Sequence, residues 1–176
     1  MCSSDLAAAL ELAVSRPDTV ISLILDSPFF LGESDRVLFR SHPVPSLEPD
    51  MEGFHLLRAW HHLRDMELWW PWFRREKAFQ SPRPSRLDPV ALTERALEVL
   101  KQPGSYAAAW QALLAYPWAS RLAACRQARA VIAADNDFAS HLIESVAEAA
   151  GTKALRVPEM RKTEEVVRLI QSHRGV

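Results

Sequence analysis

The chain has 176 residues and a formal net charge of −1, with acidic and basic residues interspersed along it. This balance gives no basic patch of the kind that attracts nucleic acids or anionic membrane surfaces, so neither is expected as a partner. A hydrophobic content of 48% is enough for a domain with a buried core. The two cysteines, Cys2 and Cys125, form no metal-ligand or disulfide pattern, and no apolar run reaches the ~18 residues of a membrane span, so a cytoplasmic protein is expected.

The first segment of the chain predicts a short helix followed by a buried strand. Leu6 to Ser15 is rich in strong helix formers, and the Arg16-Pro17 pair ends the helix because the residue before proline avoids the helical region. Val20 to Leu25 is a nearly continuous apolar run, bounded by Asp26-Ser27-Pro28. Such a run is typical of a parallel strand covered on both faces by helices.

The last third of the chain repeats this alternation of strands and helices. Strands are predicted at Arg129–Ala134 and Thr152–Val157, and helices at Phe138–Ala150, with Gly151 as its stop, and at about Arg161–Ser172. Strands alternating with helices at this spacing imply parallel strands joined by right-handed helical crossovers, hence an α/β fold.

Residues 29–126 differ from both ends, because they are helical and aromatic with no strand pattern. We therefore expect residues 1–28 and 127–176 to form an α/β core and residues 29–126 to form an inserted helical cap. Within the cap, the proline-spaced stretch from Ser41 to Pro49 predicts irregular backbone. Helices are predicted at Phe54–Asp65, from the Asp88-Pro89 start to about Leu100, at Ser105–Ala115 and at Trp118–Arg126.

The arrangement resembles the α/β-hydrolase superfamily, and particular residues carry the resemblance. The helix and strand after the nucleophile elbow are similar to Ala9–Ala13, Arg16–Val20 and Leu23–Pro28. A cap pattern in one group of these proteins is similar to Glu52–Leu56, Trp60, Arg64-Asp65 and Pro71–Arg75. The late strand whose exit loop carries the triad acid is similar to Ala130–Asp137. Together they cover nearly the whole chain.

The resemblance implies three parallel strands of an α/β-hydrolase sheet with an all-helical cap, and a parent that hydrolyses small apolar esters or acyl compounds with a Ser-His-Asp triad and no cofactor. The sequence contains no GxSxG, and the surroundings of Ser3, where the nucleophile should fall, hold no glycine. We expect this chain to be an inactive C-terminal fragment. The string from Cys2 to Leu6 matches what the end of a common sequencing adapter encodes, so homology is expected to begin near Ala7.

Three residues are candidates for catalysis. Asp137 follows a buried strand and fits the carboxylate that orients a triad histidine, although a plain helix N-cap has the same appearance. Asp26 is the alternative acid, although it also fits a turn before Ser-Pro. Val157 to Thr163, where the base should lie, contains no histidine, which leaves His55 in the cap as a weak substitute and His173 as a solvated side chain.

The cap offers an aromatic cluster and no metal site. Trp60, Trp69, Trp72 and Phe73 either form an apolar substrate pocket or pack the cap, and some of them must build its core. His61-His62 are adjacent and project differently from a helix, so no metal is expected. A second functional class stays open, a non-catalytic ligand-binding or interaction scaffold, and self-association through an exposed sheet edge is expected.

Overall fold

A computed structural model describes residues 3–81, 87–137 and 139–174, which divide into two compact units. Unit 1 comprises residues 1–32 and 115–176, and unit 2 comprises residues 33–114. The strands are β1 Ser22–Asp26, β2 Ala128–Ala134 and β3 Ala154–Val157. The helices are α1 Ser3–Ser15, α2 Glu33–Ser41, α3 Phe54–Leu68, α4 Pro89–Leu100, α5 Pro103–Ala115, α6 Trp118–Ala124, α7 Ile143–Ala149 and α8 Lys162–Arg174, with 3-10 turns at Lys77–Phe79 and Glu159–Arg161.

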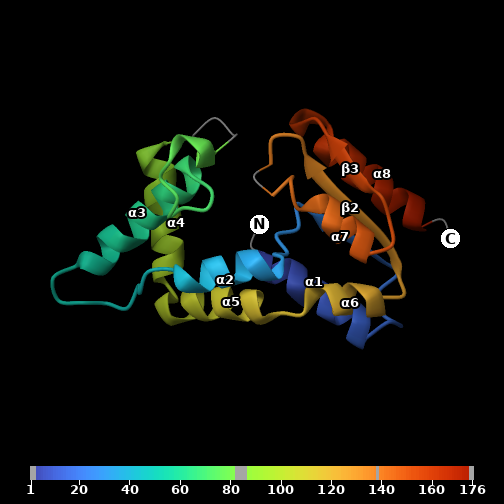
Figure 1. The fold of residues 1–176 in the computed structure, drawn as a ribbon, viewed down its shortest axis with the longest axis horizontal. Helices are drawn as coiled ribbons and strands as arrows, with labels where there is room; N and C mark the ends of the chain where they lie inside the picture. Colours follow the sequence, from blue (N-terminus) through green and yellow to red (C-terminus); the bar gives the residue numbers. More distant parts are fainter. Residues whose placement is uncertain (1–2, 82–86, 138, 175–176) are drawn as a thin grey trace. The chain divides into compact units, whose positions relative to one another are not determined.

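Unit 1 is built on a parallel sheet with strand order β1-β2-β3 (Figure 1). Asp26 in β1 lies beside Ile132 in β2, and Ala134 in β2 lies beside Val157 in β3. The predictions of an α/β fold and of three parallel strands are therefore confirmed. The finer prediction, that this is part of an α/β-hydrolase sheet with its cap, stays a prediction.

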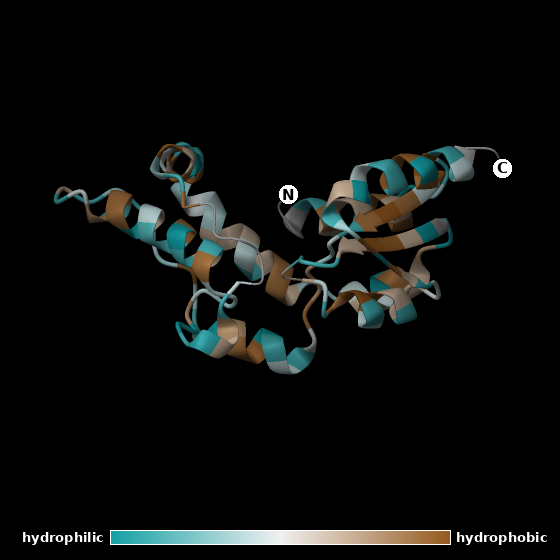
Figure 2. Ribbon diagram, turned by 90° about the horizontal axis from the view of Figure 1, so that it is seen from above, coloured by the Kyte–Doolittle hydropathy of each residue, from teal (hydrophilic) through white to brown (hydrophobic). Residues whose placement is uncertain are grey.

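Helices pack on both faces of this sheet. Helix α7 packs on β2 and β3 and α8 packs on β1 and β2 from the opposite face, while α6 contacts both α1 and α7 (Figure 1). Central strand β2 is consequently buried at every position from Ala130 to Ala134. Parts of the strands are accordingly hydrophobic in Figure 2, and the Ala130–Ala134 stretch of β2 does not alternate between apolar and polar residues because helices cover both faces.

Polar contacts attach α6 to the sheet unit. Arg121 of α6 donates two hydrogen bonds to the Glu11 carboxylate of α1, at 2.8 and 2.5 Å, and Tyr116 donates a third at 3.2 Å. The hydrogen bonds from Arg121 hold the pKa of Glu11 below its usual value. The Trp118 indole N–H donates to the Leu31 carbonyl at 2.8 Å. Residues 115–126, placed in the cap by the sequence prediction, thus belong to the sheet unit by their contacts.

Unit 2 contains only helices and turns among its described residues, apart from one isolated bridge between Trp69 and Gln80. Helices α3 and α4 pack on each other around a small core made of Leu47, Ala59, Leu63, Leu92 and Ala96. The Asp88 side chain accepts from the Val90 amide at 3.0 Å, so the predicted cap of α4 is confirmed. Residues 42–50 have no helix or strand, as the proline spacing predicts.

One local prediction was incomplete and another was wrong. Helix α2 lies in the region predicted to be helical but was not assigned a range of its own, and it presents Phe39 to the interior of unit 2. Helix α7 begins at Ile143 instead of Phe138, a residue that lies outside the described ones, because the chain first makes turns in which the Ser140 amide donates to the Asp137 carbonyl. Among the described residues, none of the helices combines the length and apolar character that crossing a bilayer requires.

Candidate functional site

The carboxyl edge of the sheet gathers polar side chains from three segments. Asp26 ends β1 and Asp137 follows β2, and parallel strands bring both to the same edge. The Ser27 hydroxyl lies 3.0 Å from Asp26 Oδ1 and 3.0 Å from Asp137 Oδ2. Lys162, the first residue of α8, places its Nζ 3.2 Å from Asp26 Oδ1. We call Asp26, Ser27, Asp137 and Lys162 the edge cluster.

Asp137 is the most buried member of the edge cluster, with 3% of the residue exposed. Its Oδ1 accepts a hydrogen bond from the Ala139 amide at 2.9 Å, and its Oδ2 accepts from Ser27. The residue therefore caps a turn and not α7, whose N-cap is Leu142.

Asp26 forms an ion pair with Lys162. Lys162 and Ser27 both approach the same oxygen of Asp26, Oδ1. A hydroxyl has one proton to donate, and the ammonium of Lys162 already supplies a donor to this oxygen, so the Ser27 proton is best placed on Asp137. Asp26 is thus tied into an ion pair that is largely shielded from solvent, which suits a structural role better than a catalytic one.

Ser27 sits on an unusual backbone turn with φ of 51°, in the left-handed region. A serine on such a turn after a parallel strand has the setting of a nucleophile elbow. Pro28 follows it, however, and proline has no N–H to help bind an oxyanion. Among the described residues its hydroxyl is also hydrogen-bonded to the carboxylates of Asp26 and Asp137 and not to a histidine. Ser27 therefore holds the edge cluster together and is unsuited to attack an acyl group.

The predicted substitute base, His55, lies in unit 2 at the start of α3. Its Nδ1 accepts a hydrogen bond from the Asp50 amide at 3.2 Å and lies 3.7 Å from Asp50 Oδ2. The Asp50 carboxylate in turn accepts from the amides of Phe54 and His55, at 2.8 and 3.0 Å. These reciprocal bonds give His55 a role in fixing the first turn of the helix.

Unit 2 contains two hollows that share one wall, Trp72. The larger, which we call the cap groove, has a volume of about 740 Å³. It is lined by Pro45, Phe54, Leu57, Arg58, His61, His62, Asp65, Trp72, Phe73 and Arg75. The smaller has a volume of about 300 Å³ and includes Phe39, Trp72 and Trp110 in its walls. Both volumes fall within the range of small-molecule sites.

The four aromatic residues predicted for a pocket divide into two pairs. Trp72 and Phe73 line the cap groove, with ring centroids 5.2 Å apart. Trp60 instead packs against the core of unit 2, and the backbone of Trp69 pairs with Gln80. The structure thus brings only Trp72 and Phe73 of this set to a hollow.

His62 is a buried group in the wall of the cap groove. Its Nε2 lies 2.9 Å from the Tyr106 hydroxyl, and its ring meets Trp72 edge-on with centroids 5.0 Å apart. Burial lowers the pKa of His62 to about 4, and the nearby Asp65 carboxylate opposes that shift only in part. The imidazole is therefore neutral at physiological pH.

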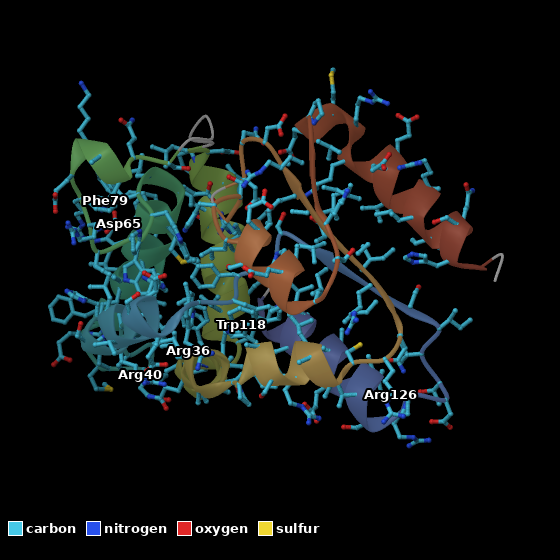
Figure 3. All side chains as sticks on the ribbon, turned by 45° about the vertical axis from the view of Figure 1, so that its right-hand side comes forward. Arg36, Arg40, Asp65, Phe79, Trp118 and Arg126 are labelled. Atoms are coloured by element: carbon cyan, nitrogen blue, oxygen red, sulfur yellow. The ribbon has the colours of Figure 1, made fainter. Side chains whose placement is uncertain are left out.

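Asp65, three residues along the same helix, is a buried carboxylate. From the sequence, Arg64-Asp65 and Arg74-Arg75 could pair or meet an anionic substrate, although solvated surface charge was the favoured interpretation. Asp65 Oδ1 accepts from Arg64 Nε at 3.0 Å and from Arg64 Nη2 at 2.7 Å, and its Oδ2 accepts from Arg75 Nη2 at 2.5 Å. Figure 3 labels Asp65 within unit 2, where Phe79 is also labelled. The signal available in the sequence was an aspartate, Asp65, next to Arg64 and followed by the Arg74-Arg75 pair.

Other titratable side chains give no further site. In residues 3–81, 87–137 and 139–174, no three His, Cys, Asp or Glu side chains converge in a way that would hold a metal ion. His173, expected to be solvated, instead buries its Nδ1 within the described structure without a hydrogen-bond partner. Ser27 and Lys162 were missed because the sequence does not show that Ser27 meets Asp137 or that Lys162 meets Asp26.

Comparison with known proteins adds no relative to these observations. No model of a known protein family matches the chain, and a search of curated proteins finds no match either.

Proposed function

We propose that the chain is part of an α/β-hydrolase-fold protein that hydrolyses small apolar esters or other acyl compounds. In this proposal Asp137 is the acid that orients and stabilises a catalytic histidine, and a nucleophile elbow lies in sequence outside these residues. The observation that carries the proposal is the buried Asp137 carboxylate, fixed by Ser27 and by the Ala139 amide at the carboxyl edge of a parallel sheet.

Two features of the fold support this proposal. The consecutive strand order β1-β2-β3 is the order expected if these are the last three strands of such a sheet. A compact helical unit, residues 33–114, enters the chain between β1 and β2, where the cap of the similar proteins is expected. Trp72 and Phe73 would then give the cap apolar walls suited to an acyl chain.

The proposal predicts that the chain alone does not turn over esters, because the sequence holds no GxSxG. The test uses the protein from the intact gene and p-nitrophenyl butyrate as substrate. Asp137→Asn should lower kcat by on the order of ten-thousandfold, the effect of losing the triad acid's control of histidine. Asp26→Asn is the matched control and should change kcat by no more than a few fold.

A second candidate function is a non-catalytic scaffold that binds a ligand. It is favoured by the absence of any histidine from residues 158–172, the segment that follows β3. An intact protein that shows no ester turnover, or whose Asp26→Asn loss equals that of Asp137→Asn, would overturn the hydrolase proposal. The first of these outcomes would favour the scaffold.

A further inference from the structure

The cap groove combines an apolar floor with an uneven distribution of charge. Its apolar walls include the buried Trp72 and the half-exposed side chains of Phe54 and Leu57. A volume of about 740 Å³ is large enough for a drug-sized ligand. Apolar side chains left partly open inside a hollow gain free energy when a ligand covers them.

The charges in this groove are organised by Asp65. With 3% of its side chain exposed, the carboxylate needs compensation, because an unpaired buried charge is costly. Arg64 occupies one of its oxygens and Arg75 the other. Two guanidinium groups on one carboxylate leave this trio with one excess positive charge.

Arg75 is the member of this trio that is most exposed to solvent. Its side chain is 62% exposed and lines the groove, whereas Arg64 does not line it and lies with its guanidinium 5.9 Å from the Trp60 ring. Only Nη2 of Arg75 is engaged by Asp65, and in the described part of the chain its other nitrogens have no ion-pair partner. A guanidinium held by one edge keeps a second edge for a planar anion.

The other polar groups of the groove do not cancel this charge. Arg58 is paired with Asp50 at 2.7 Å, so the two are close to neutral together. His62 is neutral because burial lowers its pKa to about 4. His61 is exposed and lies one helix position away from His62. Among the described residues that line the groove, the guanidinium groups are Arg58, which pairs with Asp50, and Arg75, which shares the Asp65 carboxylate with Arg64. Arg75 is therefore the groove cation whose charge is only partly balanced.

We propose that the cap groove binds the ionised form of an apolar carboxylic acid, with the carboxylate on Arg75 and the hydrocarbon body against Trp72 and Phe73. Only the role of this acid as a product or a substrate rests on the proposed function, because ester hydrolysis releases carboxylates. Binding itself requires no catalysis. Asp65 is a positioning residue here, because it holds the Arg75 side chain beside the groove.

The test is calorimetric titration of the full chain with octanoate, and with octan-1-ol as a neutral ligand with the same carbon chain. Octanoate should bind about tenfold more tightly than octan-1-ol, the worth of a charge-assisted hydrogen bond. Arg75→Gln should remove this difference and leave octan-1-ol binding unchanged. Arg75→Lys, which keeps the charge but loses the planar fork, should keep only part of it.

Arg74→Gln is the matched control. Arg74 is adjacent in sequence, pairs with Glu76 at 3.1 Å and does not line the groove. This variant should bind octanoate as the unmodified chain does. Equal affinity for octanoate and octan-1-ol, no saturable binding of either, or equal losses in the Arg74→Gln and Arg75→Gln variants would each overturn the inference.

The outcomes are separable from those of the ester assay. Titration measures heat and needs no turnover, so an absence of octanoate binding leaves the assignment of Asp137 untouched. Conversely, an intact protein that binds octanoate through Arg75 without hydrolysing esters would support the inference about the groove and contradict the hydrolase proposal.

Discussion

The Ser27 hydroxyl donates to Asp137 Oδ2 at 3.0 Å, although the two residues are 110 positions apart in the sequence. This bond connects the end of β1 to the loop after β2 on the edge where ligands of open parallel sheets bind. In the sequence, the two residues lie on either side of the helical unit, residues 33–114. The edge cluster is therefore assembled only when both segments are in place.

Ser27→Ala should lower the free energy of unfolding by about 1–3 kcal/mol, because it leaves the buried Asp137 carboxylate without this donor. Ser27→Gly removes the same hydroxyl but suits a φ of 51°, so it should destabilise less than alanine by about 0.5–1 kcal/mol. Urea unfolding of both variants measures the two effects, with Ser172→Ala as an exposed control. Equal destabilisation by alanine and glycine would contradict the assignment of strain to this turn.

Stability should fall as the pH is lowered from about 6.5 to about 4, partly through His62. Because burial lowers the pKa of folded His62 to about 4, the unfolded chain binds a proton in this window that the folded chain does not. The contribution of His62 to the free energy of unfolding is fully present above pH 6.5. At most about 3 kcal/mol of it is lost as the pH falls to about 4. His62→Gln keeps a polar partner for Tyr106 and does not titrate, so its urea unfolding should depend less on pH. A variant with an unchanged pH dependence would exclude His62 as the source.

Asp65→Asn should destabilise the protein by about 1–3 kcal/mol, since it removes the carboxylate that the Arg64 and Arg75 guanidinium groups share. Arg75→Gln should cost less than about 1 kcal/mol, because its partner retains Arg64 and the side chain is largely exposed. Thermal and urea unfolding of the two single variants and the double variant measure the interaction free energy between Asp65 and Arg75. A larger loss for Arg75→Gln than for Asp65→Asn would refute this view of the trio.

Self-association through the edge of β1 is the fourth expectation. Strand β1 pairs only with β2 among the described residues, so its other side is an unpaired edge. Ile21, which precedes the strand, is 73% exposed. Ile21→Lys should reduce any association seen by sedimentation velocity, whereas Val167→Lys, an exposed apolar position on α8, should not. A concentration-independent monomer in the unmodified chain would dismiss this edge as a contact.

The apolar runs of the sequence were sufficient to predict the strands of the sheet. Central strand β2 is buried at successive positions because helices cover both of its faces, whereas in β1 only Leu23 and Leu25 are buried. The sequence was insufficient for the start of α7, since the turn capped by Asp137 has the same residue preferences as a helix N-terminus. Helix α2 was not singled out because it is nine residues long and its apolar residues, Val37 to Phe39, are consecutive instead of recurring over several turns.

Of the candidate site, Asp26 and Asp137 could be placed at one edge from the strand endings alone. Their links to Ser27 and Lys162 could not, because side-chain contacts between distant segments leave no periodic pattern. The same limit applies to the cap groove. Asp65 and Arg75 read as surface charges in sequence, and only the fold shows that the carboxylate is buried and holds the arginine.

The adjacency of β1 and β2 in the sheet has a consequence for the order of folding. The two strands pair in register although the whole of residues 33–114 lies between them, so their pairing must close a very long loop. Contacts within the helices of that loop are local and form sooner. We therefore expect pulsed hydrogen exchange during refolding to protect the amides of α3 and α4 before those of β1, and the opposite order would argue that the strands nucleate the chain.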